Sequence, residues 1–334
     1  MEDASKRNRW AVAVLTAALA AAVLLSLRCG SQELSLSQVW QALVGGGAAG
    51  PADRIVRYVR LPRTAAAVLA GAALGVAGAL IQAVLNNAMA SPNVIGVNAG
   101  AGFASMAASA LLPGAAAVLP GASFAGALAA ALFIWMLAAR AGLSRTTLIL
   151  AGVTVSSILT AGMNTLKLLF PDAAVGSTAY LLGTLSGVTF PQIGRAGPGL
   201  AAGFVLALLL AADLDVLQLG EDIAAGLGLS VGRTRFLALL AAALLAGSAV
   251  SFCGLLGFVG LLAPHMARRL VGGGMRWLLP ATVLLSADLV LLCDVLARVL
   301  FAPFELPVGI LLSLLGGPFL LYLLLRRKRS RLYD

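Results

Sequence analysis

Charge is scarce in this 334-residue chain. Only 11% of its residues are Asp, Glu, Lys or Arg, whereas 60% are hydrophobic. Soluble domains carry about 25% charged residues, so the composition excludes an ordinary soluble protein. Several apolar runs approach the roughly 20 helical residues that a bilayer crossing takes. We therefore expect a protein of the lipid bilayer, with residues 1–334 forming one transmembrane domain.

The residue types that metal sites and many enzymes depend on are also few. His265 is the single histidine, and the three cysteines are scattered without metal-ligand spacing. None of the three lysines follows the glycine pattern of a phosphate-binding loop. The sequence therefore predicts no metal, no cofactor and no enzyme, and it assigns any ATP binding to a separate partner subunit.

The apolar segments predict an all-α polytopic membrane protein with ten transmembrane helices. Basic residues crowd both ends of the chain, which places both termini in the cytoplasm. The net charge of +10 lies mostly beside the spans and sets orientation, so it does not indicate nucleic-acid binding. The predicted helices cover residues 10–27, 64–85, 94–112, 115–139, 147–169, 198–212, 234–252, 254–271, 278–301 and 307–325.

One stretch, residues 60–102, carries the most information. Arg60 and Arg63 precede an apolar span in which Gly71, Gly75 and Gly78 are four and three residues apart. This spacing places the glycines on one helix face, where another backbone can approach closely. A polar turn follows at residues 86–93. These features predict a wall of a transport path.

Five basic residues lie in or beside one segment that is predicted to be outside: Arg28, Arg54, Arg57, Arg60 and Arg63. A positive patch on this side opposes the usual charge bias. One interpretation is docking of an acidic partner, since charge complementarity speeds encounter and fixes register. The other is contact with lipid headgroups by snorkelling side chains.

The inside loop 219–232, LGEDIAAGLGLSVG, can form a short helix with acidic residues at its start and glycines at its end. A compact helix under the membrane is a suitable lever for a cytoplasmic partner. An ordinary capped linker fits the same composition.

Several motifs together resemble the FecCD-type permease family, the ABC importers that take up iron–siderophore, haem and cobalamin complexes. The match runs through nearly the whole chain, in order and at the expected spacings. The matching pieces are RLPR at 60–63, GAAL at 71–74, GALIQ at 78–82, the turn at 87–102, LGED at 219–222, GLG at 226–228, GFVGL at 257–261, PHMAR at 264–268, DVLAR at 294–298, ELPVG at 305–309 and GGPF at 316–319.

The resemblance implies a two-fold dimer with a second permease copy or a paralogue, two cytoplasmic ABC ATPase subunits and an extracytoplasmic substrate-binding protein. It implies docking of the binding protein by Arg57, Arg60, Arg63 and Arg298. It implies ATPase coupling by Gly220, Glu221, Asp222, Ala224, Gly226 and Gly228. It implies a cytoplasmic gate at Asn87, Met89, Ser91, Pro92 and Asn93, where Ala88 replaces the family's proline and softens the turn.

The span at 147–169 is expected to line the path. Its candidate residues, with one from the preceding glycine-rich span, are Gln82, Thr154, Ser156, Ser157, Thr160 and Asn164. Some of these hydroxyls could instead form interhelical hydrogen bonds. Asp294 and Arg298 are four residues apart, so they are expected to pair on one helix face.

The resemblance therefore implies the transmembrane subunit of an ATP-driven importer that works by alternating access in the cytoplasmic (inner) membrane of a bacterium or archaeon. A ferric siderophore is the favoured cargo, ahead of haem and cobalamin. The alternative is a proton-coupled secondary transporter, for which Asp288 and Asp294 are the only sequence support.

Overall fold

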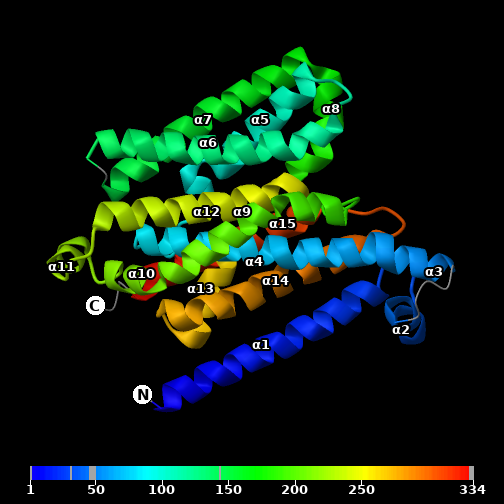
Figure 1. Cartoon of the computed structure of the whole chain (residues 1–334), viewed down its shortest axis with the longest axis horizontal. Coiled ribbons are helices and arrows are strands. Elements are labelled where there is room, and N and C mark those ends of the chain that lie inside the picture. Colours follow the sequence, from blue (N-terminus) through cyan, green and yellow to red (C-terminus); the bar gives the residue numbers. More distant parts are fainter. Residues whose placement is uncertain (1, 31, 45–49, 143, 331–334) are drawn as a thin grey trace.

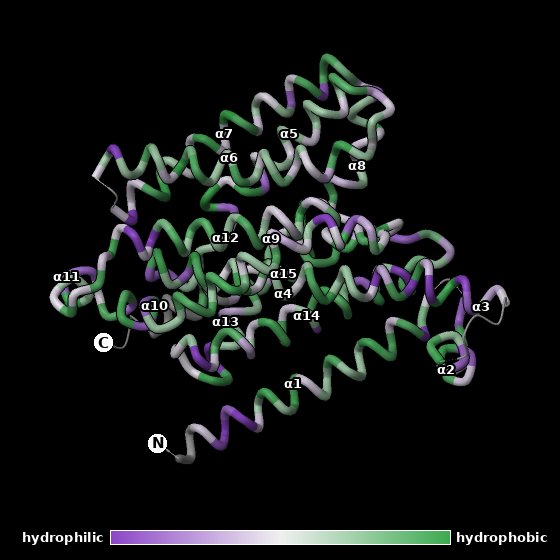
Figure 2. The backbone as a smooth tube through the Cα atoms, viewed as in Figure 1, coloured by the Kyte–Doolittle hydropathy of each residue, from purple (hydrophilic) through white to green (hydrophobic). Residues whose placement is uncertain are grey.

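The structure is a computed structural model that describes residues 2–30, 32–44, 50–142 and 144–330. Within these ranges the regular secondary structure is helical, without a strand. The long helices lie side by side and run between the two ends of the molecule (Figure 1). Apolar residues cover most of their length, while hydrophilic positions gather toward the ends (Figure 2).

The elements of the first half are α1 (Glu2–Arg28), α2 (Leu36–Val44), α3 (Pro51–Arg54), η1 (Ile55–Arg60), α4 (Leu61–Val84), η2 (Pro92–Ile95), α5 (Val97–Leu111), η3 (Ala116–Val118), α6 (Leu119–Arg140) and α7 (Arg145–Leu169). Those of the second half are α8 (Pro171–Leu182), α9 (Phe190–Leu209), α10 (Ala211–Leu217), α11 (Glu221–Gly226), α12 (Val231–Cys253), α13 (Val259–Val271), α14 (Met275–Val299) and α15 (Val308–Ser330).

Each of the ten predicted spans contains a helix, but among the described residues seven are both long and apolar enough to cross a bilayer. The three shorter ones are α5, α13 and the apolar part of α15, Val308–Tyr322. The first residues of α1 and the last of α15 lie at the same end of the molecule as α11 (Figure 1). Ten crossings and cytoplasmic termini therefore stay predictions, and residues 331–334 lie outside the described residues.

The core of the fold is α4, which packs against α12, α13 and α14. The expected close approach at its glycines is confirmed. A Cβ added at Gly71 would overlap the backbone of Ser286 and Ala287 in α14, and one added at Gly78 would overlap the carbonyl of Gly260 in α13. Without side chains at these positions, the helices pack through backbone contact, which is how association in lipid is achieved.

Among the helix starts that differ from the predicted ones, three have a clear local cause. The α4 helix is continuous with α3 and η1, so it begins at Pro51, where proline's missing N–H does no harm. Helix α9 begins at Phe190 because Thr189 and Gln192 form a capping box. Helix α13 begins five residues later than predicted. Gly254 (φ +72°) and Phe258 (φ +65°) have positive φ values, which an α-helix cannot contain, so the helix starts only after them.

Candidate functional site

A groove of about 620 Å³ lies along α7. Four predicted path residues and one predicted gate residue meet in it, although Asn93 is far from the others in sequence. The groove is lined by Asn93, Val94, Val153, Ser156, Ser157, Thr160, Ala161 and Asn164. Its polar groups are the uncharged hydroxyls and amides of Asn93, Ser156, Ser157, Thr160 and Asn164.

Two predicted path residues lie elsewhere. Thr154 is exposed on α7 outside the groove lining, and its hydroxyl donates to the Leu150 carbonyl at 2.9 Å. Gln82 is buried near the end of α4, where its amide nitrogen donates to the carbonyls of Ala90, Gly260 and Leu261 at 3.3–3.5 Å. Its side-chain oxygen accepts a hydrogen bond from Arg268 at 2.8 Å. In this conformation Gln82 joins the gate turn to α13 instead of facing the groove.

The predicted gate is a compact turn that closes the end of α4. The Asn87 side-chain oxygen accepts from the Met89 amide at 3.0 Å, and the Asn87 carbonyl accepts from the Ala90 amide at 3.1 Å. Pro92 is buried at the start of η2, after the half-buried Ser91, and Asn93 is exposed. The Asn87 side chain thus shapes the turn in which Ala88 takes the place of proline.

Helix α7 packs against η2, the short helix at the end of this turn. A Cβ added at Gly152 would overlap the Val94 carbonyl, so glycine allows the α7 backbone to touch the gate directly. The groove begins at the next residue, Val153. The same stretch of α7 therefore contacts the end of the turn and lines the groove.

The predicted coupling segment forms the short helix α11. Gly220 precedes it and Gly228 follows it, both with positive φ (+120° and +85°), so the chain turns sharply on each side. Ala224 is buried, whereas Asp222 and Gly226 are exposed. The apolar side chains of Ile223 and Leu227 are 54% and 66% exposed. This surface is typical of a contact site for another protein.

Glu221 is bound to two arginines from other helices. Its Oε1 lies 3.2 Å from Arg145 Nε in the first turn of α7 and 2.5 Å from Arg235 Nη2 in α12. The Arg235 hydrogen bond lowers the pKa of the Glu221 carboxyl; desolvation opposes this shift, and the charges of Arg235 and Arg145 add to it. Glu221 therefore stays ionised under ordinary conditions and holds both contacts.

At the opposite end, three of the predicted docking arginines are buried. Arg63 donates to Asp294 at 3.0–3.1 Å and pairs with Glu305 at 2.6 Å. Arg298 also pairs with Asp294 at 3.2 Å, which confirms the pair expected on α14. A buried charge requires such partners, because desolvation is otherwise too unfavourable.

The remaining contacts of this network fix the end of α1. Arg60 donates to the carbonyls of Leu27, Arg28 and Gln32. Arg298 donates to the carbonyls of Ser26 and Cys29 at 3.2 and 3.0 Å. The sequence placed Arg60 and Arg63 in a positive patch open to docking or headgroup contact, whereas in the structure Arg60, Arg63 and Arg298 are buried and bonded within the chain. Docking by these residues stays a prediction. Arg57 is the docking candidate that retains exposure, at 34% of its side chain, while paired with Asp53 at 2.8 Å.

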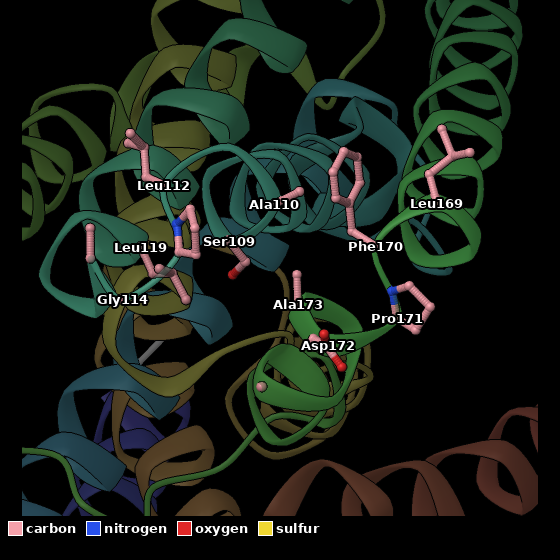
Figure 3. Close-up of a pocket in the computed structure, with 13 residues that line it drawn as sticks. Ser109, Ala110, Leu112, Gly114, Leu119, Leu169, Phe170, Pro171, Asp172 and Ala173 are labelled. Atoms are coloured by element: carbon pink, nitrogen blue, oxygen red, sulfur yellow. The ribbon is translucent and has the colours of Figure 1, made fainter.

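A second hollow of about 620 Å³ lies at the same end as α3, between the α5–α6 connection and the α7–α8 junction. Asp172 is the charged residue in its lining, which is otherwise formed mainly by apolar side chains such as Leu112 and Phe170 (Figure 3). The residue pattern gave no signal of this hollow, because it depends on how two distant loops meet.

The two acidic residues that supported a carrier differ in their surroundings. Asp294 is fully buried and paired with Arg63 and Arg298. Asp288 is also buried, and neither of its oxygens has a hydrogen-bond partner among the described residues. Asp294 is therefore engaged in ion pairs that hold α14 to α4.

Sequence reasoning missed the partners of the residues it selected. Arg145, Arg235 and Glu305 contact Glu221 or Arg63 across large sequence separations. In the sequence, Arg145 and Arg235 indicate only the orientation of the neighbouring spans. Glu305 belonged to a recognised motif, but nothing in the sequence pointed it toward Arg63.

The fold and site define a multi-pass membrane protein with a polar groove along α7, a tight turn at the end of α4 and the short exposed helix α11. The profile of the FecCD transport family matches residues 18–326. Over 320 residues the chain is 37% identical to the Fe(3+)-citrate import system permease protein YfmE of Bacillus subtilis (strain 168), covering 96% of each. Over 325 residues it is 40% identical to the ferric enterobactin transport system permease protein FepD of Escherichia coli (strain K12), again covering 96% of each.

A solved structure described as an inward-facing metal-chelate type ABC transporter superposes with a TM-score of 0.80. The two sequences are 26% identical, and the match covers 94% of this chain and 98% of the other. The chain belongs to the FecCD transport family. It is a permease subunit of an ABC transporter, a class of protein that carries no ATPase activity of its own.

Proposed function

We propose that this chain imports a ferric chelate across the cytoplasmic membrane of a bacterium or archaeon, driven by separate ATPase subunits. The observation that carries this proposal is the groove in which Asn93 of the gate meets Ser156, Ser157, Thr160 and Asn164 of α7. The cargo is taken from the relatives, because YfmE is named for Fe(3+)-citrate and FepD for ferric enterobactin.

A second permease subunit, either a copy or a paralogue, would complete the path. Helix α7 is long enough to span the bilayer, yet only 17% of its most apolar window is buried within the chain. Its exposed surface carries apolar residues such as Leu150 and Ile158 beside the polar groove. Two α7 helices facing each other would shield these apolar residues and enclose the polar groove.

The ATPase would act on α11, and the cargo would be delivered at the opposite end of the molecule. Ile223 and Leu227 offer an apolar contact for a cytoplasmic ATPase. The binding protein would dock at the end that holds α3, where Arg57 remains partly exposed and the buried arginines keep the surface in shape. Alternating access then consists of opening the groove first to this end and later past the gate turn.

The test is uptake in proteoliposomes that contain this chain with its ATPase, its second permease subunit and its binding protein. We expect radioactive iron from ferric citrate or a ferric siderophore to accumulate only when ATP is present on the side of the membrane where the ATPase subunits are bound. Haem and cobalamin in the same assay define the cargo class. Uptake that needs no ATPase and follows an imposed proton gradient would instead support the carrier, with Asp288 as its proton site.

A further inference from the structure

The coupling helix α11 has few attachments to the rest of the chain. Most of its surface is exposed, and Ala224 is its one buried residue. Its ion pairs with other helices come from Glu221, at its first position. A partner that moves α11 can therefore displace the other helices only through few contacts. Among these, the Glu221 ion pairs have the most defined geometry.

We propose that Glu221 is a positioning residue: its ion pair with Arg145 ties α11 to the start of α7, so that movement of α11 is carried to the gate and groove. This inference rests on the proposed function and adds to it the specific link between the ATPase contact and the path. The pair with Arg235 anchors the same carboxylate to α12, the buried neighbour of α4.

The route beyond Arg145 is continuous. Ser144 caps α7 by accepting from the Thr147 amide at 3.0 Å, so the first turn is firmly formed. Gly152 touches the Val94 carbonyl of the gate turn two turns later, about 10 Å along the helix at 1.5 Å per residue. The groove residues of α7 follow directly. A helix is stiff over this distance, so α7 can transmit a shift at Arg145 to both features.

The exposure of the pair makes the idea testable. The Glu221 side chain is 40% exposed and that of Arg145 is 31% exposed. Ion pairs this open to water add little to folding stability. Arg145→Gln should therefore leave the subunit folded and assembled, with its effect in coupling alone. Glu221→Gln also takes the carboxylate away from Arg235, whose side chain is 6% exposed, so its melting temperature is compared with that of wild type, and Arg145→Gln carries the test if Glu221→Gln is destabilised.

The experiment compares Glu221→Gln and Arg145→Gln with the matched control Asp213→Asn in the complete reconstituted transporter. Asp213 is also acidic and lies on the neighbouring helix α10, outside the predicted coupling residues, and it forms no ion pair among the described residues. The readouts are ATPase co-purification, ATP hydrolysis and ferric citrate uptake. We expect both pair variants to retain the ATPase and its hydrolysis while ATP consumed per iron imported rises about five-fold or more, the low end of typical coupling factors. Asp213→Asn should match wild type.

A covalent replacement separates linkage from charge. In a background without Cys29, Cys253 and Cys293, cysteines at positions 221 and 145 are joined by a short bifunctional thiol reagent. We expect the uncross-linked double variant to be uncoupled and the cross-linked one to regain the wild-type ratio. A local structural defect would not be rescued in this way.

The results distinguish the two levels of the argument. If the wild-type complex shows no ATP-dependent iron uptake, the proposed function itself fails. If wild type couples and Glu221→Gln couples equally well, only the linkage is overturned. Loss of ATPase co-purification in Glu221→Gln would likewise overturn the linkage by making Glu221 a docking contact. An equal defect in Asp213→Asn would overturn it by making Glu221 one acidic group among others.

Discussion

Helices α4 and α7 are both apolar and both long enough to cross a bilayer, yet they are packed in opposite ways. In the most apolar window 83% of the residues of the helix ending in α4 are buried, against 17% for α7. Helix α4 touches its neighbours through glycine backbones, whereas α7 presents hydroxyls and amides outward. The difference is consistent with two roles: α4 holds the subunit together, and α7 has the exposed surface that we propose faces a second subunit and the transported solute.

The largest expected effect is the loss of stability when the buried ion pairs of Asp294 with Arg63 and Arg298 are broken. Asp294→Ala would leave Arg63 and Arg298 buried without their shared carboxylate. Breaking a buried pair typically destabilises by about 3–5 kcal/mol, so we expect little folded subunit in the membrane. Fluorescence-detected size-exclusion chromatography measures this. The exposed Asp172→Ala serves as the control and should behave as wild type; equal recovery of the two variants would contradict a structural role for the network.

The glycine contacts of α4 should show the next largest effect. In Gly78→Ala the new methyl group would overlap the Gly260 carbonyl, and overpacking of this kind typically destabilises by about 1–3 kcal/mol. The melting temperature in detergent should fall. Gly121→Ala in α6 adds the same methyl group where no atom lies within 4 Å, so the melting temperature of this control variant should not fall. A stable Gly78→Ala variant would show that α4 and α13 are less tightly packed.

Changes on α7 should spare the fold and impair transport. Ser157→Val combined with Thr160→Val makes the groove apolar at two positions. We expect normal thermal stability and slower ferric citrate uptake, because the solute loses hydrogen-bonding groups on its way. Thr165→Val on the same helix lies outside the groove lining and should transport normally. A defect in Thr165→Val of the same size would remove the groove's special role.

The smallest effect concerns pH. The Glu221 pKa lies below its ordinary value, so the contribution of its ion pairs is present above the ordinary pKa, about 4.3, and is lost only as pH falls through the lowered value. The charged groups that face it are Arg145 and Arg235. The ATP consumed per iron imported should therefore not change through Glu221 between pH 8 and about 5. A transition within that range in wild type, absent from Glu221→Gln, would contradict the assignment.

The sequence predicted the helical class, the approximate positions of the apolar segments and four of the α7 residues that line the groove, because these depend on local composition and on one helix face. It also predicted the close approach at Gly71 and Gly78. It could not predict that Arg60, Arg63 and Arg298 are buried, because their partners are backbone carbonyls and acidic groups from distant segments. The displacement of Gln82 from the path has the same origin, since its partner Arg268 comes from another helix.

The most direct test of the account is labelling of α7 in the assembled transporter with a charged, membrane-impermeant thiol reagent. Single cysteines replace Ser157 and Thr160 in the groove, Ile158 on the exposed apolar surface and the buried Ala70 in α4, all in a cysteine-free background. The account predicts labelling at 157 and 160, protection of both by ferric citrate delivered by its binding protein, and no labelling at 158 or 70. Labelling confined to 158, or none on α7 at all, would contradict the claim that the polar groove of α7 lines the transport path.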